Sequence, residues 1–234
     1  MDNLKKIEKL PVNRYLDHAV LKPNLTPAEA EKEMRLGVQY AVKSICVRPC
    51  DIELAKTIAK GTETDVSCVL AFPHGCIASQ NKADEAKRYV DLGVAEIDMV
   101  VNYGLIRAGQ FDALCQDILA VTDIARPAGV TVKTIFETSQ LTLDEVAFAT
   151  KAAIQANADF VKTSTGFNGE GATEKVIKVM LETAAGKIKV KPSGGIRDLA
   201  RAEMFINMGV HRLGVGSSST PIICGGSGET TDAY

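Results

Sequence analysis

The stretch "ADFVKTSTGFNGEGATEKVIKVMLETAAGKIKVKP", residues 158–192, contains two strand patterns separated by a helix pattern. Apolar and β-branched residues dominate residues 158–164 and alternate with lysines over residues 187–191, whereas apolar residues recur with helical spacing over residues 173–186. A strand, a helix and a second strand in this order predict two parallel strands joined by a crossover helix. Each of the two strands carries a lysine near its carboxyl end, and the first of these, Lys162, follows an apolar run that gives it few polar neighbours.

The same unit recurs along the whole chain of 234 residues. Helical patterns lie between apolar runs that read as strands, at residues 16–21, 41–47, 65–72, 95–101, 130–138, 158–164, 187–192 and 211–217. Eight repeats in a chain of this length predict a single-domain (β/α)8 TIM barrel, which typically takes about 250 residues. The alternative is a doubly wound open sheet, but the G-x-G-x-x-G turn that often follows its first strand is absent from this sequence.

Helix boundaries are marked by residue type. Thr26 is expected to cap a helix that begins at Pro27, with Glu29 completing a capping box. Gly93 is expected to stop the helix predicted over residues 81–93, since glycine tolerates the backbone turn that ends a helix.

Composition argues against several partner classes. The 27 basic and 29 acidic side chains give a net charge of −2, which favours neither nucleic acid nor an anionic membrane as a partner. The sequence has no apolar run long enough for a membrane span and no secretory leader pattern. Its six cysteines form no Cys-x-x-Cys pair, so a cytoplasmic protein with reduced cysteines is expected. The three histidines lack metal-binding spacing, so no metal is expected. The first 17 residues predict a short polar helix, and residues 224–234 predict a mobile tail.

In a barrel of this type the functional site lies at the carboxyl ends of the strands. Lys162 and Lys191 lie there on neighbouring strands, and both can point into the barrel. Two converging ammonium groups repel each other, so one loses its proton more easily, and a neutral amine can attack a carbonyl to form a Schiff base. Asp98, at the end of another strand, can compensate the lysine charges and move protons. The alternative is a structural ion pair; Lys133 lies deeper and is expected to be structural, whereas Glu137 is expected to line the site.

Glycine-rich loops follow the last three predicted strands, with the sequences "STGFNGEGATEK", "SGGIRD" and "GVGSSS". Glycine lets backbone N–H groups approach an oxyanion, and barrel phosphate sites are frequently built from the loops after strands seven and eight. The loops therefore predict a phosphate site, although ordinary turns and helix caps are the alternative. The residues predicted to form it are Gly166, Gly194, Gly195, Arg197, Gly214 and Ser217.

Segments spread over residues 16–218 resemble the deoxyribose-phosphate aldolase family of Schiff-base aldolases: "LDHAVLKP", "SICV", "FPHG", "AEIDMVVN", "FETSQLT", "DFVKTSTGF", "VKPSGGIRD" and "HRLGVGSS". The resemblance implies a (β/α)8 fold and the reversible cleavage of 2-deoxyribose 5-phosphate to glyceraldehyde 3-phosphate and acetaldehyde, without metal or organic cofactor. It implies that Lys162 forms the Schiff base, that Lys191 is the second lysine and that Asp98 transfers protons.

The resemblance also implies substrate contacts at Asp17, Cys46, Thr165 and Gly216. Cys46 is expected to be a small packing residue rather than a nucleophile, because no histidine partner is evident nearby in the sequence. Tyr234 ends the chain, as a tyrosine does in some family members, and is expected to reach the site and transfer protons; an accidental aromatic end is the alternative.

The sequence departs from the family at three positions. Ala19 stands where threonine is frequent, Pro192 where alanine is common and Gly216 where serine is common. None of these removes the chemistry, but the glycine leaves open how the phosphate is held.

Two other functions are consistent with these residues. Another Schiff-base aldolase of the same fold would differ in its sugar phosphate and in its donor aldehyde. A barrel that only binds or isomerises a sugar phosphate would use the lysines as anion contacts and would form no covalent adduct. Barrels of this kind are often dimers, so a homodimer is considered, although no sequence signal decides it.

Overall fold

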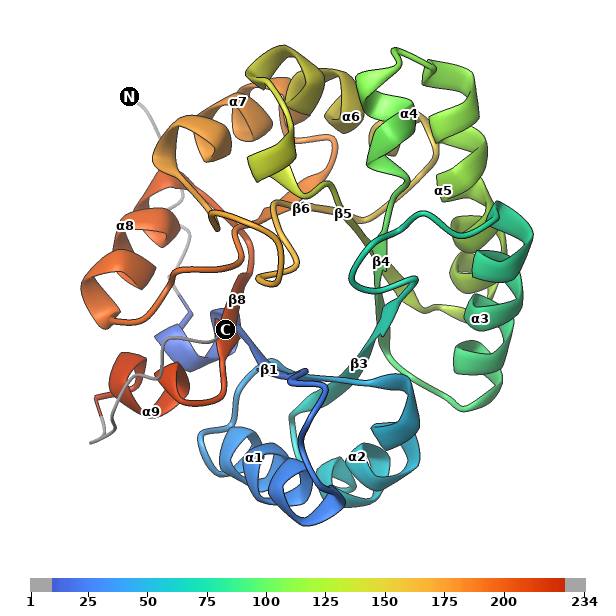
Figure 1. Cartoon of the computed structure of the whole chain (residues 1–234). Coiled ribbons are helices and arrows are strands. Elements are labelled where there is room, and N and C mark those ends of the chain that lie inside the picture. Colours follow the sequence, from blue (N-terminus) through green and yellow to red (C-terminus); the bar gives the residue numbers. More distant parts are fainter. Residues whose placement is uncertain (1–9, 226–234) are drawn as a thin grey trace, which may run out of the picture.

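Eight parallel strands form the centre of the computed structural model, which describes residues 10–225 (Figure 1). They follow the order β7-β6-β5-β4-β3-β2-β1-β8. A bridge between Ser193 and Gly214, and a hydrogen bond of 2.9 Å from the Gly214 N–H to the Pro192 carbonyl, join β7 to β8 and close the ring. The strands are β1 (Leu16–Val20), β2 (Ser44–Val47), β3 (Asp65–Leu70), β4 (Glu96–Val100), β5 (Thr131–Ile135), β6 (Phe160–Lys162), β7 (Lys189–Lys191) and β8 (Leu213–Gly216).

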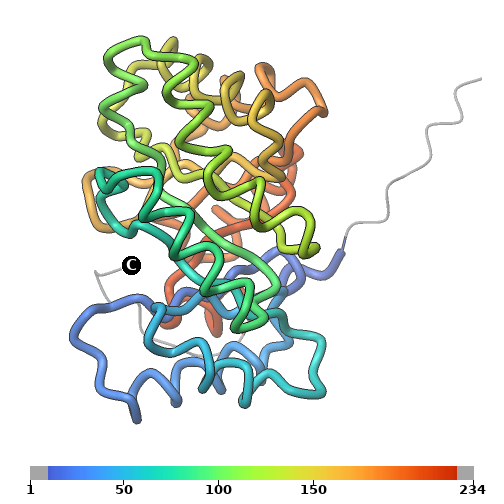
Figure 2. The backbone as a smooth tube through the Cα atoms, turned by 90° about the vertical axis from the view of Figure 1, so that its right-hand side faces the viewer, coloured from blue at the N-terminus to red at the C-terminus, as the bar shows by residue number. Residues whose placement is uncertain are grey.

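Helices connect successive strands and form a layer around the barrel (Figures 1 and 2). The α-helices are α1 (Pro27–Gln39), α2 (Ile52–Ala59), α3 (Ser79–Asp91), α4 (Tyr103–Arg107), α5 (Phe111–Ala125), α6 (Leu143–Gln155), α7 (Glu174–Ala184), α8 (Leu199–Met208) and α9 (Ser219–Ile223). The 3-10 helices are η1 (Val12–Tyr15), η2 (Pro49–Asp51), η3 (Arg126–Ala128) and η4 (Thr138–Gln140). Within residues 10–225, no helix combines the length and the apolar character that a membrane span requires.

The predicted alternation of strands and helices is confirmed, and the open sheet is excluded because the bridge between Ser193 and Gly214 joins the two end strands β7 and β8. The predicted capping box is present: Thr26 accepts a hydrogen bond from the Glu29 N–H, and the Glu29 carboxylate accepts one of 2.8 Å from the Thr26 N–H. Gly93 follows α3 with a φ of 77°, as expected of a helix stop. The short helix α4 was not predicted; Asn102 caps it by accepting a hydrogen bond of 3.1 Å from the Gly104 N–H.

Several strands are shorter than predicted because left-handed residues end the preceding helices. Ala41 and Asn157 have φ values of 48° and 56°, and β2 and β6 begin only three residues after them, at Ser44 and Phe160. The described part of the predicted N-terminal helix contains the single turn η1. Residues 1–9 lie outside the described residues, and so does most of the predicted tail with Tyr234.

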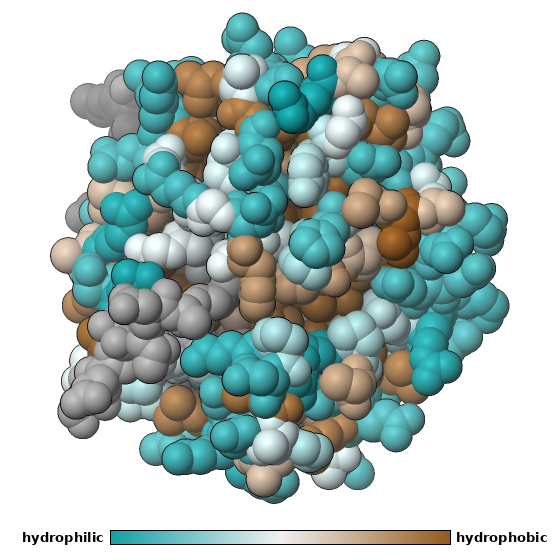
Figure 3. All heavy atoms as spheres, viewed as in Figure 1, coloured by the Kyte–Doolittle hydropathy of each residue, from teal (hydrophilic) through white to brown (hydrophobic). Residues whose placement is uncertain are grey.

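Alternate strand residues point into the barrel. On β4, Ile97 and Met99 are buried in the hydrophobic core between strands and helices, whereas Glu96 and Asp98 contact charged side chains inside the barrel. Branched aliphatic residues usually fill a barrel interior, and here buried acidic and basic side chains take much of that space. Figure 3, viewed as in Figure 1, shows hydrophilic side chains over most of the helical rim.

Candidate active site

Lys162 and Lys191 end the adjacent strands β6 and β7 and are paired in the register of the sheet. Both side chains point into the barrel, where each is 1 % exposed. Both reach Asp98 on β4, because the Nζ atoms of Lys162 and Lys191 lie 2.9 and 2.7 Å from the same carboxylate oxygen, Oδ2. The structure thus brings together the three charged residues that the sequence singled out, with one oxygen between the two amines.

A further set of charges lies beside Asp98 inside the barrel. The Lys133 Nζ atom lies 2.7 Å from Asp98 Oδ1 and 2.5 Å from Glu96 Oε2. Arg212 approaches the other oxygen of Glu96 at 2.8 Å. Lys133 is fully buried, in agreement with its predicted deeper position. It neutralises the Asp98 oxygen that the two strand-end lysines do not contact.

Asp17 links this set back to the strand-end lysines. Its Oδ1 atom lies 2.5 Å from Arg212 and accepts a hydrogen bond of 2.7 Å from the Ser44 hydroxyl. Its Oδ2 atom lies 2.5 Å from Lys191 Nζ and 3.1 Å from Lys133 Nζ. Asp17, which the resemblance assigns to substrate binding, is therefore placed within the buried charge network and is 1 % exposed.

The network holds one more positive than negative group; its carboxylates are Asp17, Glu96 and Asp98, and its cations are Lys133, Lys162, Lys191 and Arg212. Burial opposes charge at Lys133, but its carboxylate partners hold its pKa well above the ordinary value. Burial lowers the pKa of Lys191 despite its two carboxylate partners. With Lys133 and Arg212 charged, one further ammonium balances the carboxylates, so the network favours a neutral amine at one of the two strand-end lysines.

Asp98 itself is held ionised. Burial disfavours its carboxylate, but the charges of Lys133, Lys162 and Lys191 hold its pKa well below the usual range. It is therefore an acceptor of hydrogen bonds from the two amines, and a proton that leaves one amine can pass along this carboxylate to the other.

An apolar wall faces these charges. It consists of a buried cluster inside the barrel: Ala19, Leu21, Cys46 and Val69, with Phe72 packed against it. Burial, and next the charge of Asp98, raise the pKa of the Cys46 thiol, so Cys46 is a packing group rather than a thiolate nucleophile. Phe72 extends the wall outward to Phe167, with ring centroids 5.4 Å apart in an edge-to-face contact. A pocket of about 450 Å³ opens beside the two rings; most of its lining is apolar, and Arg48, His74 and Glu85 complete it.

A second cavity, of about 270 Å³, has glycine-rich walls, and one of its walls adjoins Lys191: a Cβ added to Gly214 would lie 3.3 Å from Lys191 Cε. Gly166, Gly194 and Gly195 have φ values of 86°, 83° and 75°, which other residues rarely adopt. Concave backbone of this kind can present N–H groups to an anion. The lining residues are Gly166, Gly169, Glu170, Gly171, Gly194, Gly195, Ile196, Arg197, Gly214, Gly216 and Ser219.

The predicted loop glycines and Arg197 line this cavity, but Thr165 and Ser217 do not belong to its lining. The Thr165 hydroxyl instead donates a hydrogen bond of 2.5 Å to Glu137. Ser217 is buried just before α9, and Ser219, the first residue of that helix, lines the cavity in its place. Ser219 was missed although it lies in the serine-rich run that drew attention to Ser217, and Glu170 was missed because a carboxylate is not expected beside an anion.

Glu137 lies beneath the loop that follows β6. It is fully buried and has a left-handed backbone with a φ of 57°. Burial raises the pKa of its carboxyl, against the opposing effect of its hydrogen bonds from Thr165. It was predicted to line the site, and the structure places its side chain behind the wall of the glycine-rich cavity.

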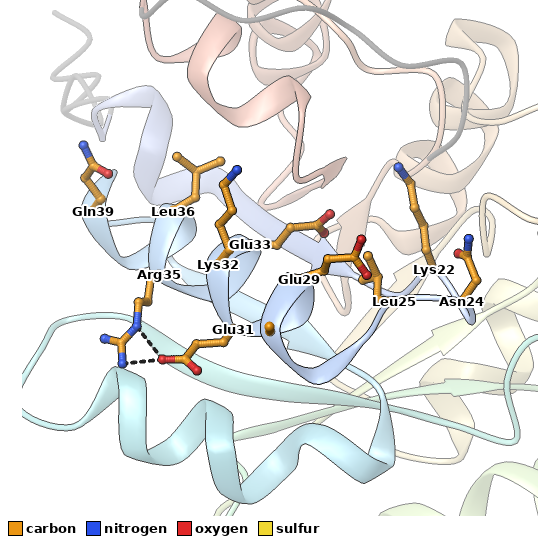
Figure 4. Close-up of a pocket in the computed structure, with 11 residues that line it drawn as sticks. Lys22, Asn24, Leu25, Glu29, Glu31, Lys32, Glu33, Arg35, Leu36 and Gln39 are labelled. Atoms are coloured by element: carbon orange, nitrogen blue, oxygen red, sulfur yellow. Dashed lines mark hydrogen bonds and ion pairs between the residues drawn. The ribbon is translucent and has the colours of Figure 1, made fainter.

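A third hollow, of about 830 Å³, lies over α1 and the loop before it (Figure 4). Its walls carry side chains of mixed charge, such as the exposed ion pair of 2.7 Å between Arg35 and Glu31. Neither the strand-end lysines nor the glycine-rich loops contribute to it. The barrel interior and the glycine-rich cavity, which contain the chemistry-bearing residues, are therefore the candidate active site.

Comparison with known proteins points to one family. A family model described as "DeoC/LacD family aldolase" matches residues 14–211. The chain is 41% identical over 207 residues to a deoxyribose-phosphate aldolase of Natranaerobius thermophilus, covering 88% of this chain and 94% of that protein. A solved structure titled "QR15, an Aldolase" matches with a TM-score of 0.86 and 35% identity, covering 92% and 95% of the two chains. The tetrameric deoxyribose phosphate aldolase of Aeropyrum pernix shares the fold, with a TM-score of 0.83, 23% identity and coverage of 91% and 89%.

Proposed function

Because this chain belongs to the DeoC/LacD family of aldolases, we propose that it reversibly cleaves 2-deoxyribose 5-phosphate to glyceraldehyde 3-phosphate and acetaldehyde, a step of deoxyribonucleotide catabolism, through a Schiff base on Lys162. The substrate is supported by the name of relatives that are about as long as this chain. One observation carries the mechanism: Asp98 Oδ2 lies within hydrogen-bond distance of the amines of both Lys162 and Lys191.

Schiff-base formation begins at the aldehyde carbon of the open-chain sugar. The neutral amine of Lys162 attacks this carbon and gives a carbinolamine, which loses water to become a protonated imine. Burial lowers the pKa of Lys191. In this mechanism Lys191 nevertheless holds the positive charge, since it contacts the carboxylates of both Asp17 and Asp98, and its charge favours a neutral amine at Lys162. Asp98 connects the two amines, so it can carry the proton that must leave Lys162 and the proton that the departing water requires.

Carbon–carbon cleavage then uses the imine as an electron sink. Asp98, acting through a water molecule, accepts the proton of the C3 hydroxyl, and the C2–C3 bond electrons move to the imine nitrogen. Glyceraldehyde 3-phosphate leaves and an enamine remains, which takes a proton at C2 and is hydrolysed to acetaldehyde and free Lys162. The apolar wall would surround the two-carbon fragment, and the glycine-rich cavity would hold the phosphate and position the reacting bond.

We also propose a proton-transfer role for Tyr234, which lies outside the described residues. The sequence supports it in two ways: the tail before Tyr234 is polar and glycine-rich and follows the eighth strand, and some family members also end in a tyrosine. Changing Tyr234 to Phe should lower kcat while Schiff-base trapping at Lys162 stays unchanged. An unchanged rate of solvent proton exchange into acetaldehyde would contradict this role.

Borohydride trapping with acetaldehyde tests the proposed function. Reduction should leave an ethyl group on Lys162, located by peptide mass spectrometry, and Lys162→Ala should abolish both label and turnover. Lys178→Ala is the control, because that lysine is exposed on α7. Label on Lys191 with Lys162 unmodified would reverse the roles of the two lysines, and no label with any aldehyde would favour a barrel that only binds or isomerises its sugar.

A panel of donor aldehydes and ketones separates the proposed enzyme from a Schiff-base aldolase of different specificity. Acetaldehyde should give the fastest condensation with glyceraldehyde 3-phosphate. A preference for a keto acid or for a phosphorylated ketone would assign the chain to another aldolase activity.

A further inference from the structure

The buried carboxylate of Glu137 is not used in the mechanism above, and its surroundings point to a separate task. We propose that Glu137 is a positioning residue for phosphate recognition: it holds the loop between β6 and α7 in the conformation that closes the glycine-rich cavity. The inference rests on the proposed function in taking a sugar phosphate as the natural occupant of that cavity.

The backbone of Glu137 is held in place from both sides. Its left-handed conformation is one that a glutamate rarely adopts without constraint from its surroundings. The Phe136 N–H donates a hydrogen bond of 3.1 Å to the Lys162 carbonyl, and the Thr138 N–H donates one of 2.9 Å to the Thr163 carbonyl. These bonds hold the carboxyl end of β5 against the carboxyl end of β6. The turn between them directs the Glu137 side chain under the next loop.

Both oxygens of the carboxylate are used by a single residue of that loop. Glu137 Oε1 accepts a hydrogen bond of 3.2 Å from the Thr165 N–H, and Oε2 accepts one of 2.5 Å from the Thr165 hydroxyl. The same hydroxyl oxygen accepts a hydrogen bond of 3.1 Å from the Phe167 N–H. The carboxylate therefore fixes the first turn of the loop, including Gly166, which lines the cavity.

The far end of the loop is fixed by close packing against the next one. A Cβ added to Gly194 would lie 2.9 Å from the Gly171 Cα, so the two backbones are in direct contact. The Ala172 N–H also donates a hydrogen bond of 3.0 Å to the Ser193 carbonyl.

Two further side chains hold this loop: the Ser139 hydroxyl donates a hydrogen bond of 2.7 Å to the Asn168 carbonyl, and Arg201 donates one of 2.8 Å to the Ala172 carbonyl. Glu137 is the anchor at the amino end of the loop, where it holds Thr165 directly before Gly166.

A buried carboxylate is costly unless its oxygens are hydrogen-bonded. An apolar side chain in this place could fill the same space, but it could not accept two bonds from one residue. A positioning role predicts a loss confined to phosphate recognition, whereas a role in folding or in the lysine chemistry predicts equal losses for phosphorylated and unphosphorylated sugars. This difference makes the proposal testable.

The experiment compares 2-deoxyribose 5-phosphate with 2-deoxyribose in Glu137→Ala and Thr165→Val. We expect kcat/KM for the phosphorylated sugar to fall at least about tenfold in each variant, because a misplaced phosphate misplaces the reacting carbon. For the free sugar the loss of kcat/KM in each variant should be at least about threefold smaller than for the phosphorylated sugar. The double variant should lose little more than either single variant, since both changes break the same contact. Glu182→Gln, an exposed acid on α7, is the control and should match wild type.

Inorganic phosphate provides a readout that does not depend on catalysis. It should raise the Tm of the wild-type protein and of the control, and should raise the Tm of Glu137→Ala and Thr165→Val much less. Equal losses for both sugars, or an undiminished Tm rise in both variants, would overturn the positioning role. Failure of the wild-type enzyme to cleave either sugar would instead overturn the proposed function, and the phosphate titration would still decide the role of Glu137.

Discussion

Removing the positive charge of Arg212, which lies between Asp17 and Glu96 inside the barrel, should move the pH dependence of catalysis. In Arg212→Met the buried network keeps its three carboxylates and its three ammonium groups, so its positive excess disappears. A neutral amine at Lys162 or Lys191 then leaves the network negatively charged, whereas in the wild-type protein the same loss of a proton leaves it balanced. The acid limb of the kcat/KM profile, which reports the pKa of the reacting amine in the free enzyme, should therefore move to higher pH.

The magnitude follows from the geometry around Asp17. Arg212 and Lys191 each approach one oxygen of its carboxylate at 2.5 Å. The two cations are consequently about 7 Å apart or closer, and at an effective dielectric constant of about 20 they repel each other by roughly 2.4 kcal/mol. This energy corresponds to about 1.7 pKa units, so we expect the limb to move by between about 1 and 2 pH units.

The assay measures kcat/KM for 2-deoxyribose 5-phosphate and the rate of borohydride trapping across the neutral pH range. Glu96→Gln removes a negative charge and should move the limb to lower pH. The double variant Arg212→Met/Glu96→Gln regains an excess of one positive charge and should return the limb close to its wild-type position. It also controls for stability, because Arg212→Met alone removes one ion-pair partner from both Asp17 and Glu96 and leaves these buried carboxylates with lysine partners only. A folded Arg212→Met enzyme with an unmoved limb, or a double variant that behaves like it, would refute the electrostatic reasoning.

Three further predictions concern stability and phosphate recognition. The ring nitrogens of His18 lie 2.8 Å from Thr220 Oγ1 and 2.9 Å from the Glu33 carbonyl oxygen, and burial lowers its pKa to about 4. Between pH 6.5, the usual pKa of an unfolded histidine, and pH 4, only the unfolded chain binds the proton. The free energy of unfolding should therefore fall by up to about 3 kcal/mol as the pH drops through this range. In denaturant titrations, the free energy of unfolding of His18→Gln should depend less on pH than that of the wild-type protein. Gly195→Val places a β-branched residue at a φ of 75° in the wall of the glycine-rich cavity. It should raise KM for the phosphorylated sugar about tenfold or more, with little effect on KM for free deoxyribose; equal effects on both sugars would count against the cavity as a phosphate site. Glu170→Gln removes a carboxylate from the same lining and should lower KM for the sugar phosphate about threefold; an unchanged KM would show that solvent already screens this charge.

The fold could be predicted because its signals are local. Each strand and helix has its own periodicity, and residues such as Thr26 and Gly93 mark helix ends through bonds and backbone angles within a few residues. Closure of the barrel has no such signal. It depends on the bridge between Ser193 and Gly214, where an added Cβ would lie 2.9 Å from the Ser193 Cβ atom. Nothing in the sequence distinguishes this glycine from those of ordinary turns.

Site residues could be predicted where the alternation of side chains along a strand decides which face they point to. This alternation, together with their place near the carboxyl ends of the strands, put Lys162, Lys191 and Asp98 on the inner face at one end of the barrel. The contacts deeper in the barrel could not be predicted, because strand tilt decides which side chains meet; Arg212, at the amino end of its strand, was not singled out. The left-handed backbone of Glu137 was also hidden, since glutamate rarely adopts it and bonds to the neighbouring strand impose it.

The deep charges explain why two lysines alone would not make this site. A buried network kept only for stability would be balanced, and apolar residues of similar volume would often serve as well. Here Lys133 and Arg212 match the charge of Glu96 and Asp17, which leaves Asp98 as the remaining carboxylate for two amines. One of those amines can therefore lose its proton without leaving an unpaired buried charge. The residues at the middle of the barrel thus set the protonation of the residues at its carboxyl end, and the Arg212 and Glu96 variants measure how strongly they do so.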